Sequence, residues 1–445
     1  MKRAAATTAK VLAREVFKTS RELEYFTRKE LTLQTGHEPE RWSEVAFKEL
    51  IDNGLDACES ANTLPSIKIT VADDSLTITD NGPGIPESVI ESVLDFSVRA
   101  SSKDAYISPT RGAQGNALKT VLAIPYVLND QNSARLEITT QGALHRITVE
   151  IDRLAQKPAI SHQKAEAIVK NGTSVKVYWP SELALNNDLA IWRFLQLLEG
   201  YSLFNPHAEF SLDDERLFQR SSDTCEKWLA SEPTSPHWYT LEQLRALIAA
   251  YIVSEQHGAQ ARTVREFVTE FRGLSATAKQ KKILASVGMA GVYLRDLVKD
   301  GDIDRSAVEK LLAAMRAESK PVKPAHLGFI GEDHFRAWFE SQGVELQTME
   351  YRRVADIDSK TGRPFVVEIA FAARRDNEDR RLITGINWSP TLVDPFRSFS
   401  AYGFGLASLL SSLKVEPDDA VTFVLHLACP HLNYTDRGKS SLEGL

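Results

Sequence analysis

Hydrophobic positions along the first part of the chain follow two different periods. From Phe47 to Cys58, in FKELIDNGLDACES (47–60), apolar side chains recur at i, i+3 and i+4, which predicts a helix. In PSIKITVADDSLTITDNGPGIP (65–86), apolar and polar residues alternate, which predicts two strands joined by the turn ADDS. We therefore expect a helix followed by a hairpin.

Three further segments alternate in the same way. They are ARLEITTQ (134–141), ALHRITVEI (143–151) and GTSVKVYW (172–179). The first two are separated by Gln141-Gly142, which favours a hairpin turn. Together with the helix before them, these strands predict an α/β sandwich with an antiparallel-rich sheet, closing near YSLFNPHAEFSL (201–212).

The pattern then changes twice. Residues 213–237 are polar and contain two prolines, which is typical of a linker. From Thr240 to Ser319 the apolar spacing is helical, with Thr240 and Asp304 expected at helix starts. The expected helical segments are TLEQLRALIAAYIV (240–253), TVREFVTEF (263–271), ATAKQKKILASVG (276–288), GVYLRDLV (291–298) and DRSAVEKLLAAMRAE (304–318). Farther on, the strand-like RPFVVEIAFAA and AVTFVLHLACP stand on either side of the helix-like GFGLASLLSSL, which predicts a second α/β domain.

Composition narrows the class of protein. The 445 residues are 43% hydrophobic and 25% charged, as in a soluble globular chain of two or three domains. Cys58, Cys225 and Cys429 form no CxxC pair, so neither a disulfide framework nor a zinc site is expected, and a reducing cytoplasm fits. No apolar run approaches a membrane span, so no membrane contact is expected. The net charge of −7 argues against a protein that coats nucleic acid, and any DNA contact needs local patches such as KQKK (279–282).

Candidate chemistry begins on the first helix. Glu49, Asp52, Asn53 and Asp56 fall at i, i+3, i+4 and i+7, so they share one face, and no Lys or Arg lies within this stripe. Like charges at this spacing repel each other. The stripe is therefore either a solvated surface or a site that needs a bound cation.

Two glycine-containing loops follow. In DNGPGIP, Asp80 ends a strand, and Gly82 and Gly84 predict a tight turn over which a flat ligand could approach that carboxylate. Taken alone, this is an ordinary β-turn. In TRGAQGNALKTV, Gly112 and Gly115 precede an apolar helix, and such helix starts bind anions.

The order of these motifs resembles the GHKL ATPase superfamily of gyrase-type topoisomerases, the ninety-kilodalton heat-shock chaperone, sensor histidine kinases and MutL. Glu49 and Asn53 match its ExxxN helix, Asp80 begins its DxGxG turn, and Gly112 and Gly115 match its lid glycines. The resemblance implies a Bergerat-fold domain that binds ATP and Mg²⁺.

The same resemblance implies a role for each residue. Asn53 would ligate Mg²⁺, Glu49 would be the general base, and Asp80 would accept a hydrogen bond from adenine. Mg²⁺ on the triphosphate would then be the missing counter-charge, with Asp52 and Asp56 supporting the site. The expected nucleotide-binding residues are Asn53, Asp56, Asp80, Gly82, Gly84, Ile85, Ser102, Lys103, Gly112, Gln114, Gly115, Asn116, Ala117, Leu118, Lys119 and Thr173.

Beyond the ATPase motifs, the chain resembles the B subunit of type IIB topoisomerase, topoisomerase VI. KELIDNGLDACESANTLPSIKI, SPHWYTLEQLRALI and VTFVLHLACPHLNYTDRGKSSLEGL carry this resemblance in the family's order. It implies an α+β chain with four parts: an N-terminal arm (1–40), a GHKL ATPase domain (41–215), a linker with a helix-two-turn-helix-like domain (216–319) and a transducer-like domain (320–445). Lys439, in TDRGKSS, matches the transducer lysine that reaches the γ-phosphate, and is the second expected catalytic residue.

The expected function is an ATP-dependent clamp. Two chains would form a homodimer on ATP, exchange N-terminal arms around Tyr25 and Phe26, and act on double-stranded DNA in the cytoplasm, at the nucleoid in a prokaryote. The sequence stops at Leu445, before the helix that carries the A subunit in the family, so a separate topoisomerase VI A-like subunit is expected to cleave DNA. The alternatives are a MutL- or MORC-like switch without topoisomerase activity and a nucleotide binder without turnover, against which the intact Glu49 argues.

Overall fold

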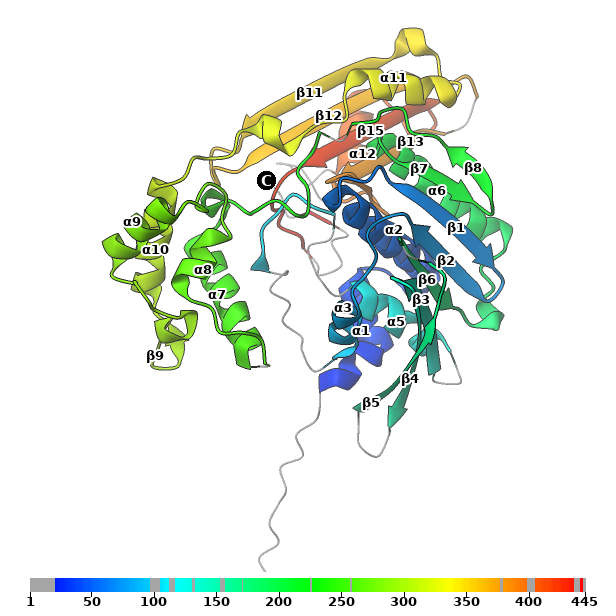
Figure 1. Cartoon of the computed structure of the whole chain (residues 1–445). Helices are drawn as coiled ribbons and strands as arrows, with labels where there is room; N and C mark the ends of the chain where they lie inside the picture. The colour runs from blue at the N-terminus through cyan, green and yellow to red at the C-terminus, as the bar shows by residue number, and fades with distance from the viewer. Residues whose placement is uncertain are drawn as a thin grey trace, which may run out of the picture.

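The expected α+β fold class is confirmed by two mixed sheets and a group of helices between them in sequence (Figure 1). The computed structural model describes residues 21–96, 105–111, 117–129, 133–152, 157–169, 171–224, 226–256, 258–376, 379–397, 405–435 and 441–442. Among these residues, no helix is both long enough and apolar enough to cross a membrane.

The first sheet has eight strands in the order β5-β4-β3-β6-β2-β1-β7-β8, and only the pair β1–β7 is parallel. Its strands are β1 (Ser66–Ala72), β2 (Ser75–Asp80), β3 (Ser133–Thr140), β4 (Ala143–Asp152), β5 (Lys157–Glu166), β6 (Thr173–Tyr178), β7 (Glu209–Leu212) and β8 (Glu215–Phe218). The five strands expected from alternation are confirmed. The turn between β3 and β4 has φ of 46° at Gln141 and 78° at Gly142, the left-handed backbone that a two-residue hairpin turn favours.

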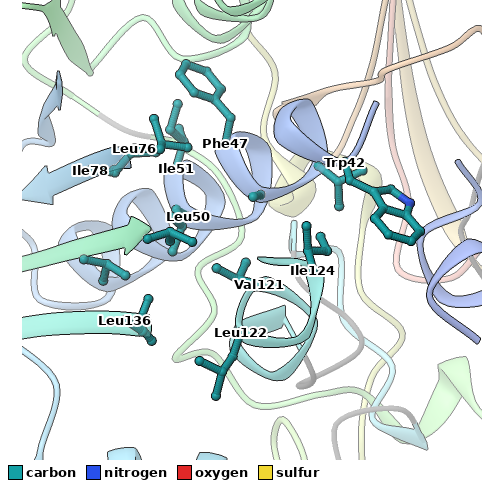
Figure 2. Packing of buried hydrophobic residues seen from close by; sticks show 14 of the residues in the cluster. Trp42, Phe47, Leu50, Ile51, Leu76, Ile78, Val121, Leu122, Ile124 and Leu136 are labelled. Atoms are coloured by element: carbon teal, nitrogen blue, oxygen red, sulfur yellow. The ribbon is translucent and has the colours of Figure 1, made fainter. Parts of the chain in front are cut away.

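Helices pack on this sheet and close its core. They are α1 (Arg28–Thr35), α2 (Trp42–Ser60), α3 (Glu87–Leu94), α5 (Ala117–Leu128) and α6 (Asp188–Phe204). Figure 2 shows the apolar face of α2 directed toward β2 and α5, with Leu50 and Ile51 near Ile78 and Val121. Among the polar residues of α2, Asn53 is exposed and Glu49 half-buried, whereas Asp52 and Glu59 are buried.

Tyr25 and Phe26 are anchored in the first domain, while the arm before them, residues 1–20, lies outside the described residues, so the expected exchange of arms stays a prediction. Both side chains are buried in their own chain, in the short 3-10 helix η1 (Arg21–Phe26). Their rings contact Phe96 at centroid distances of 5.6 and 4.9 Å, and Phe26 also contacts Tyr126 at 5.1 Å. Burial of both aromatic side chains fixes the point where the N-terminal arm joins the domain.

The helical group contains α7 (Leu241–Gln256), α8 (Val264–Thr269), α9 (Thr277–Val287) and α10 (Arg305–Ala317). The helix start expected at Asp304 is confirmed, because its carboxylate accepts the Ala307 N–H at 3.0 Å. The helix expected over 291–298 is wrong: residues 294–297 form a 3-10 turn, η5 (Leu294–Leu297). Asp296 caps the start of this turn by accepting the Tyr293 N–H at 2.9 Å, and the turn ends at Leu297 because Val298 and Lys299 pair with the next strand. The short strands β9 (Val298–Lys299) and β10 (Asp302–Ile303) follow.

The second sheet has the order β11-β12-β15-β13-β14. Its elements are α11 (Glu332–Ser341), β11 (Glu350–Ile357), β12 (Pro364–Ala373), β13 (Arg381–Ile386), β14 (Ser389–Pro390), α12 (Leu406–Ser412) and β15 (Val421–Ala428). Figure 1 shows β11 and β12 crossing the top of the molecule, with the helical group α7–α10 on one side. The turn between β13 and β14 reaches down to α2 and α6, and this contact connects the second sheet to the candidate site.

Candidate active site

Helix α2 packs on the end of β2 through its buried face, at Gly54. Glu49 is half-buried and Asn53 is exposed, one helical turn apart. The next residue, Gly54, packs against the strand end, where a Cβ would lie 3.2 Å from both the Asp80 Cβ and the Ile67 side chain. A glycine at this point lets α2 approach the strand end closely, and Asn53 is the residue directly before this contact.

The turn after β2 is built around the Asp80 carboxylate. Its Oδ1 accepts the Gly82 N–H at 2.8 Å, and a Cβ on Gly82 would lie only 2.9 Å from that oxygen. Gly84 has φ of 86°, and the next N–H, that of Ile85, donates to Thr140 Oγ1 at 2.8 Å. The two glycines therefore serve the turn itself and leave one side of the carboxylate uncovered by side chains of the turn.

Thr173 is brought to the same place by the sheet. It lies opposite Asp80 in the β2–β6 register. Gly172, with φ of 84°, donates its N–H to the Gly82 carbonyl at 2.7 Å, so the loop before β6 is bonded to the Asp80 turn. Burial raises the pKa of Asp80 to about 6, although hydrogen bonds from Gly82 and Thr173 oppose the rise.

The start of α5 lies at Ala117, as expected for the helix after the glycine-rich loop. Lys119, expected to add charge to an anion site, is buried and donates to the Asp95 carbonyl at 2.7 Å, with its ammonium 5.7 Å from the Phe96 ring centre. Burial lowers the pKa of Lys119. Leu118, the other predicted residue on this helix, is a partly buried member of the hydrophobic core.

Several predicted residues lie outside the described part of the chain. They are Ser102, Lys103, Gly112, Gln114, Gly115, Asn116 and Lys439, together with the side chain of Ala117. The phosphate loop and the transducer lysine therefore stay predictions.

The counter-charge inferred for the acidic stripe needs correction. Lys48 Nζ lies 2.7 Å from Asp52 Oδ2, and Arg111 lies 2.7 Å from Asp56 Oδ1. Two of the three carboxylates are therefore neutralised by the protein itself. The stripe spacing could not show this, because Lys48 lies beside the stripe and Arg111 comes from a distant loop. Glu49 and Asn53 are the members of the stripe that we expect to face a metal-bound nucleotide.

Arg111 is the centre of a buried ionic cluster that the sequence did not predict. Its guanidinium forms a two-bond pair with Glu59, with nitrogen–oxygen distances of 2.8 and 2.7 Å. Lys227 and His207 lie 2.7 and 2.8 Å from the same carboxylate. Burial alone would raise the pKa of Glu59, but the charges of Arg111 and Lys227 hold it well below its usual range. Glu59 is therefore an ionised, multiply bonded carboxylate inside the protein.

A second buried contact, also missed, joins α2 to the rest of the chain. Asp52 accepts hydrogen bonds from Tyr201 Oη and Ser389 Oγ, each at 2.8 Å. Neither partner belongs to the ATPase motifs from which the site was predicted. Asp52 is thus a structural carboxylate, and the support it gives to the site acts through α2.

Comparison with known proteins agrees with the motifs. Residues 40–182 match the family described as "Histidine kinase-, DNA gyrase B-, and HSP90-like ATPase". The B subunit of type 2 DNA topoisomerase 6 from Archaeoglobus fulgidus is 23% identical over 426 residues, covering 90% of this chain and 66% of that protein. The corresponding protein from Metallosphaera sedula, which has the same name, is 26% identical over 414 residues, covering 86% of this chain and 72% of that protein.

The chain thus spans about two thirds of the length of these relatives. Among solved structures, the ATPase region of Saccharomyces cerevisiae topoisomerase II matches with a TM-score of 0.41 and 11% identity, covering 90% of this chain and 76% of that chain. A score at that level does not by itself establish a common fold. The resemblance inferred from the ATPase motifs is confirmed by the family model, and the resemblance to the topoisomerase VI B protein by the similar sequences.

Proposed function

We propose that this chain, whose residues 40–182 carry a histidine kinase-, gyrase B- and HSP90-like ATPase domain, binds and hydrolyses ATP as the ATPase component of a topoisomerase VI-like system. The observation that carries the proposal is the meeting of α2 with the end of β2. Gly54 lets the helix carrying Glu49 and Asn53 pack directly on Asp80. A separate DNA-cleaving protein, resembling the topoisomerase VI A protein, and double-stranded DNA complete the proposed system.

The residues present suit ATP and Mg²⁺. The Asp80 carboxylate is fixed by the Gly82 N–H on one oxygen, and the turn glycines add no side chain above it, so an exocyclic amino group can donate to it. The exposed Asn53 amide offers a neutral oxygen of the kind Mg²⁺ accepts. When bound, Mg²⁺ neutralises charge on the triphosphate. Glu49 would orient a water and accept its proton, and Lys439 would add positive charge at the γ-phosphate.

The raised pKa of Asp80 makes nucleotide affinity depend on pH. Below pH 6 the empty protein holds Asp80 protonated, and the bond from adenine requires the carboxylate, so binding must release a proton. Affinity for a non-hydrolysable ATP analogue should fall by about tenfold per pH unit below about 6 and level off above it. Titration calorimetry between pH 5 and pH 8 measures this dependence.

The matched variant is Asp80→Asn, in which no carboxyl titrates. It should bind the analogue more weakly at pH 8, by about 1.5–3 kcal/mol. Its affinity should also lose the part of the pH dependence that comes from titration of the Asp80 carboxyl. Titration of the nucleotide's own phosphate is common to both proteins and cancels in the comparison. Equal pH profiles for the two proteins would show that Asp80 does not bind the base.

The clamp model predicts a change of mass on nucleotide binding. We expect a monomer without nucleotide and a dimer with the analogue, because the triphosphate would engage the glycine- and serine-rich sequence 97–116 and change the surface offered to a second copy. Multi-angle light scattering at micromolar protein, with ADP and Asp80→Asn as controls, tests this. A constant mass in the presence of bound analogue would exclude the clamp.

A further inference from the structure

The turn between β13 and β14 has an unusual backbone. Asn387 and Trp388, its two central residues, have φ of 49° and 63°, while Ile386 and Ser389 pair across the hairpin. A left-handed backbone is common for asparagine in such turns, but it is unfavourable for a bulky side chain such as tryptophan. A strained residue persists when its surroundings hold it, and strain of this kind gathers at functional elements.

Trp388 is held from three parts of the chain. Its N–H donates to His426 Nε2 on β15 at 3.1 Å, within the second sheet. Its carbonyl accepts from Asn205 Nδ2 at 2.9 Å, at the end of α6, and from Arg111 Nε at 3.4 Å. The indole is 2% exposed, and the Lys227 ammonium lies 5.1 Å from its ring centre. The turn therefore contacts the buried ionic cluster directly.

Ser389, the next residue, contacts the helix of the candidate site. Its hydroxyl lies 2.8 Å from both carboxylate oxygens of Asp52, which is 3% exposed. Asp52 lies three residues after Glu49 and directly before Asn53. Any rotation or shift of α2 that moves the catalytic face must also move Asp52 relative to Ser389.

Arg111 adds a second connection to the same turn. It directly precedes the predicted phosphate-loop glycine, Gly112, and it bonds both Asp56 on α2 and the Trp388 carbonyl. The β13–β14 hairpin is thus hydrogen-bonded both to α2, which carries the predicted general base Glu49, and to Arg111, the residue directly before the predicted phosphate loop. Both connections are buried, where polar bonds are costly to break and have few alternative arrangements.

We propose that the Trp388–Ser389 turn couples the nucleotide site to the second sheet, with Ser389 and Asp52 as positioning residues for Glu49 and Asn53. This inference rests on the proposed function and adds to it the contacts through which the nucleotide site is connected to the second sheet. Coupling is reciprocal: if nucleotide binding shifts the turn, then a shift of the turn must also change the affinity of the site for nucleotide. The sheet that holds the turn through His426 then responds to the nucleotide state.

The first test removes the Ser389 hydroxyl. Ser389→Ala should lower kcat for ATP roughly three- to thirtyfold while the Kd for the analogue changes less than about twofold, because the variant alters positioning and not the binding groups. Ser389→Thr, which retains a hydroxyl, should recover most of the turnover. Thr391→Val is the matched control, since the Thr391 hydroxyl hydrogen-bonds to Thr384 beside the same hairpin, whereas the Ser389 hydroxyl hydrogen-bonds to Asp52 on α2. An equal loss of kcat in Thr391→Val would overturn the inference.

The second test follows the turn itself by hydrogen exchange in the full chain. Binding of the analogue should change exchange of the Trp388 amide at least severalfold in the wild type, and Ser389→Ala should reduce that response. A wild-type chain that binds the analogue with no change at the turn overturns the inference alone. A wild-type chain that does not bind the analogue overturns the proposed function and the inference together.

Discussion

Replacing Glu49 by alanine should reduce ATP turnover by about 10²–10⁴-fold and leave nucleotide binding nearly unchanged. Glu49 is half-buried on the polar face of α2, opposite the apolar face formed by Leu50 and Ile51, so its removal should not disturb the core. The proposed adenine contact at Asp80 and the metal contact at Asn53 remain. Loss of the base should then appear in kcat and not in the dissociation constant.

Two variants make this prediction specific. Glu49→Gln keeps the size and hydrogen-bonding capacity of the side chain but cannot accept the proton, so its turnover should fall nearly as far. Glu87→Ala is the matched control, because it removes an exposed carboxylate of α3 that is paired with Lys164 at 2.6 Å. Steady-state phosphate release and calorimetry with the analogue supply the two readouts. Wild-type turnover in Glu49→Ala would remove Glu49 from the mechanism.

Some strands could be predicted from the sequence and others could not, and one reason is the extent to which their side chains are buried. In the inner strand β1 buried and exposed residues alternate, and in β2 the apolar Leu76 and Ile78 are buried among partly buried polar residues, so the period of two was visible in the sequence. Several strands were not predicted, among them the edge strands β5 and β11 and the short strands β7, β8, β13 and β14. Every residue of β5 and β11 is exposed or only partly buried, so neither strand needs an apolar face that repeats every second residue. These two segments are strands because their backbones pair with β4 and β12, and this pairing cannot be seen in the local sequence.

The candidate site also has a part that could be predicted from the sequence and a part that could not. Glu49 with Asn53, and Asp80 with its two glycines, are close in sequence, so local spacing was enough to predict them as sets. The contacts that support them are not local: Ser389 and Asp52 are 337 residues apart, and Arg111 and Glu59 are 52 apart. Each is an ordinary polar residue in its own segment. The packing of the second sheet against α2 brings Ser389 to Asp52, and the fold of the first part of the chain brings Arg111 to Glu59.

The buried ionic cluster leads to the largest expected change in stability. Glu59 accepts bonds from Arg111, Lys227 and His207, and the charges of the first two hold its pKa well below the usual range. Glu59→Gln removes the negative charge and leaves two buried cations with too little compensation. Breaking a buried pair in this way should lower the free energy of unfolding by about 3–5 kcal/mol.

The stabilisation by Glu59 should depend on pH, and the direction of its pKa shift gives the sign of that dependence. Because the folded pKa of Glu59 is depressed, its ionised form stabilises the protein above the unfolded value of 4.5, and this stability is lost as pH falls toward the folded pKa. Denaturant unfolding at pH 7 should separate wild type from Glu59→Gln widely, and the gap should narrow as pH falls below 4.5. Asp214→Asn, at an exposed ion pair with Lys68, is the control and should cost less than about 1 kcal/mol. A loss in Glu59→Gln no larger than that of the control would mean that the cluster does not depend on the charge of Glu59, and that packing alone holds α2 against Arg111.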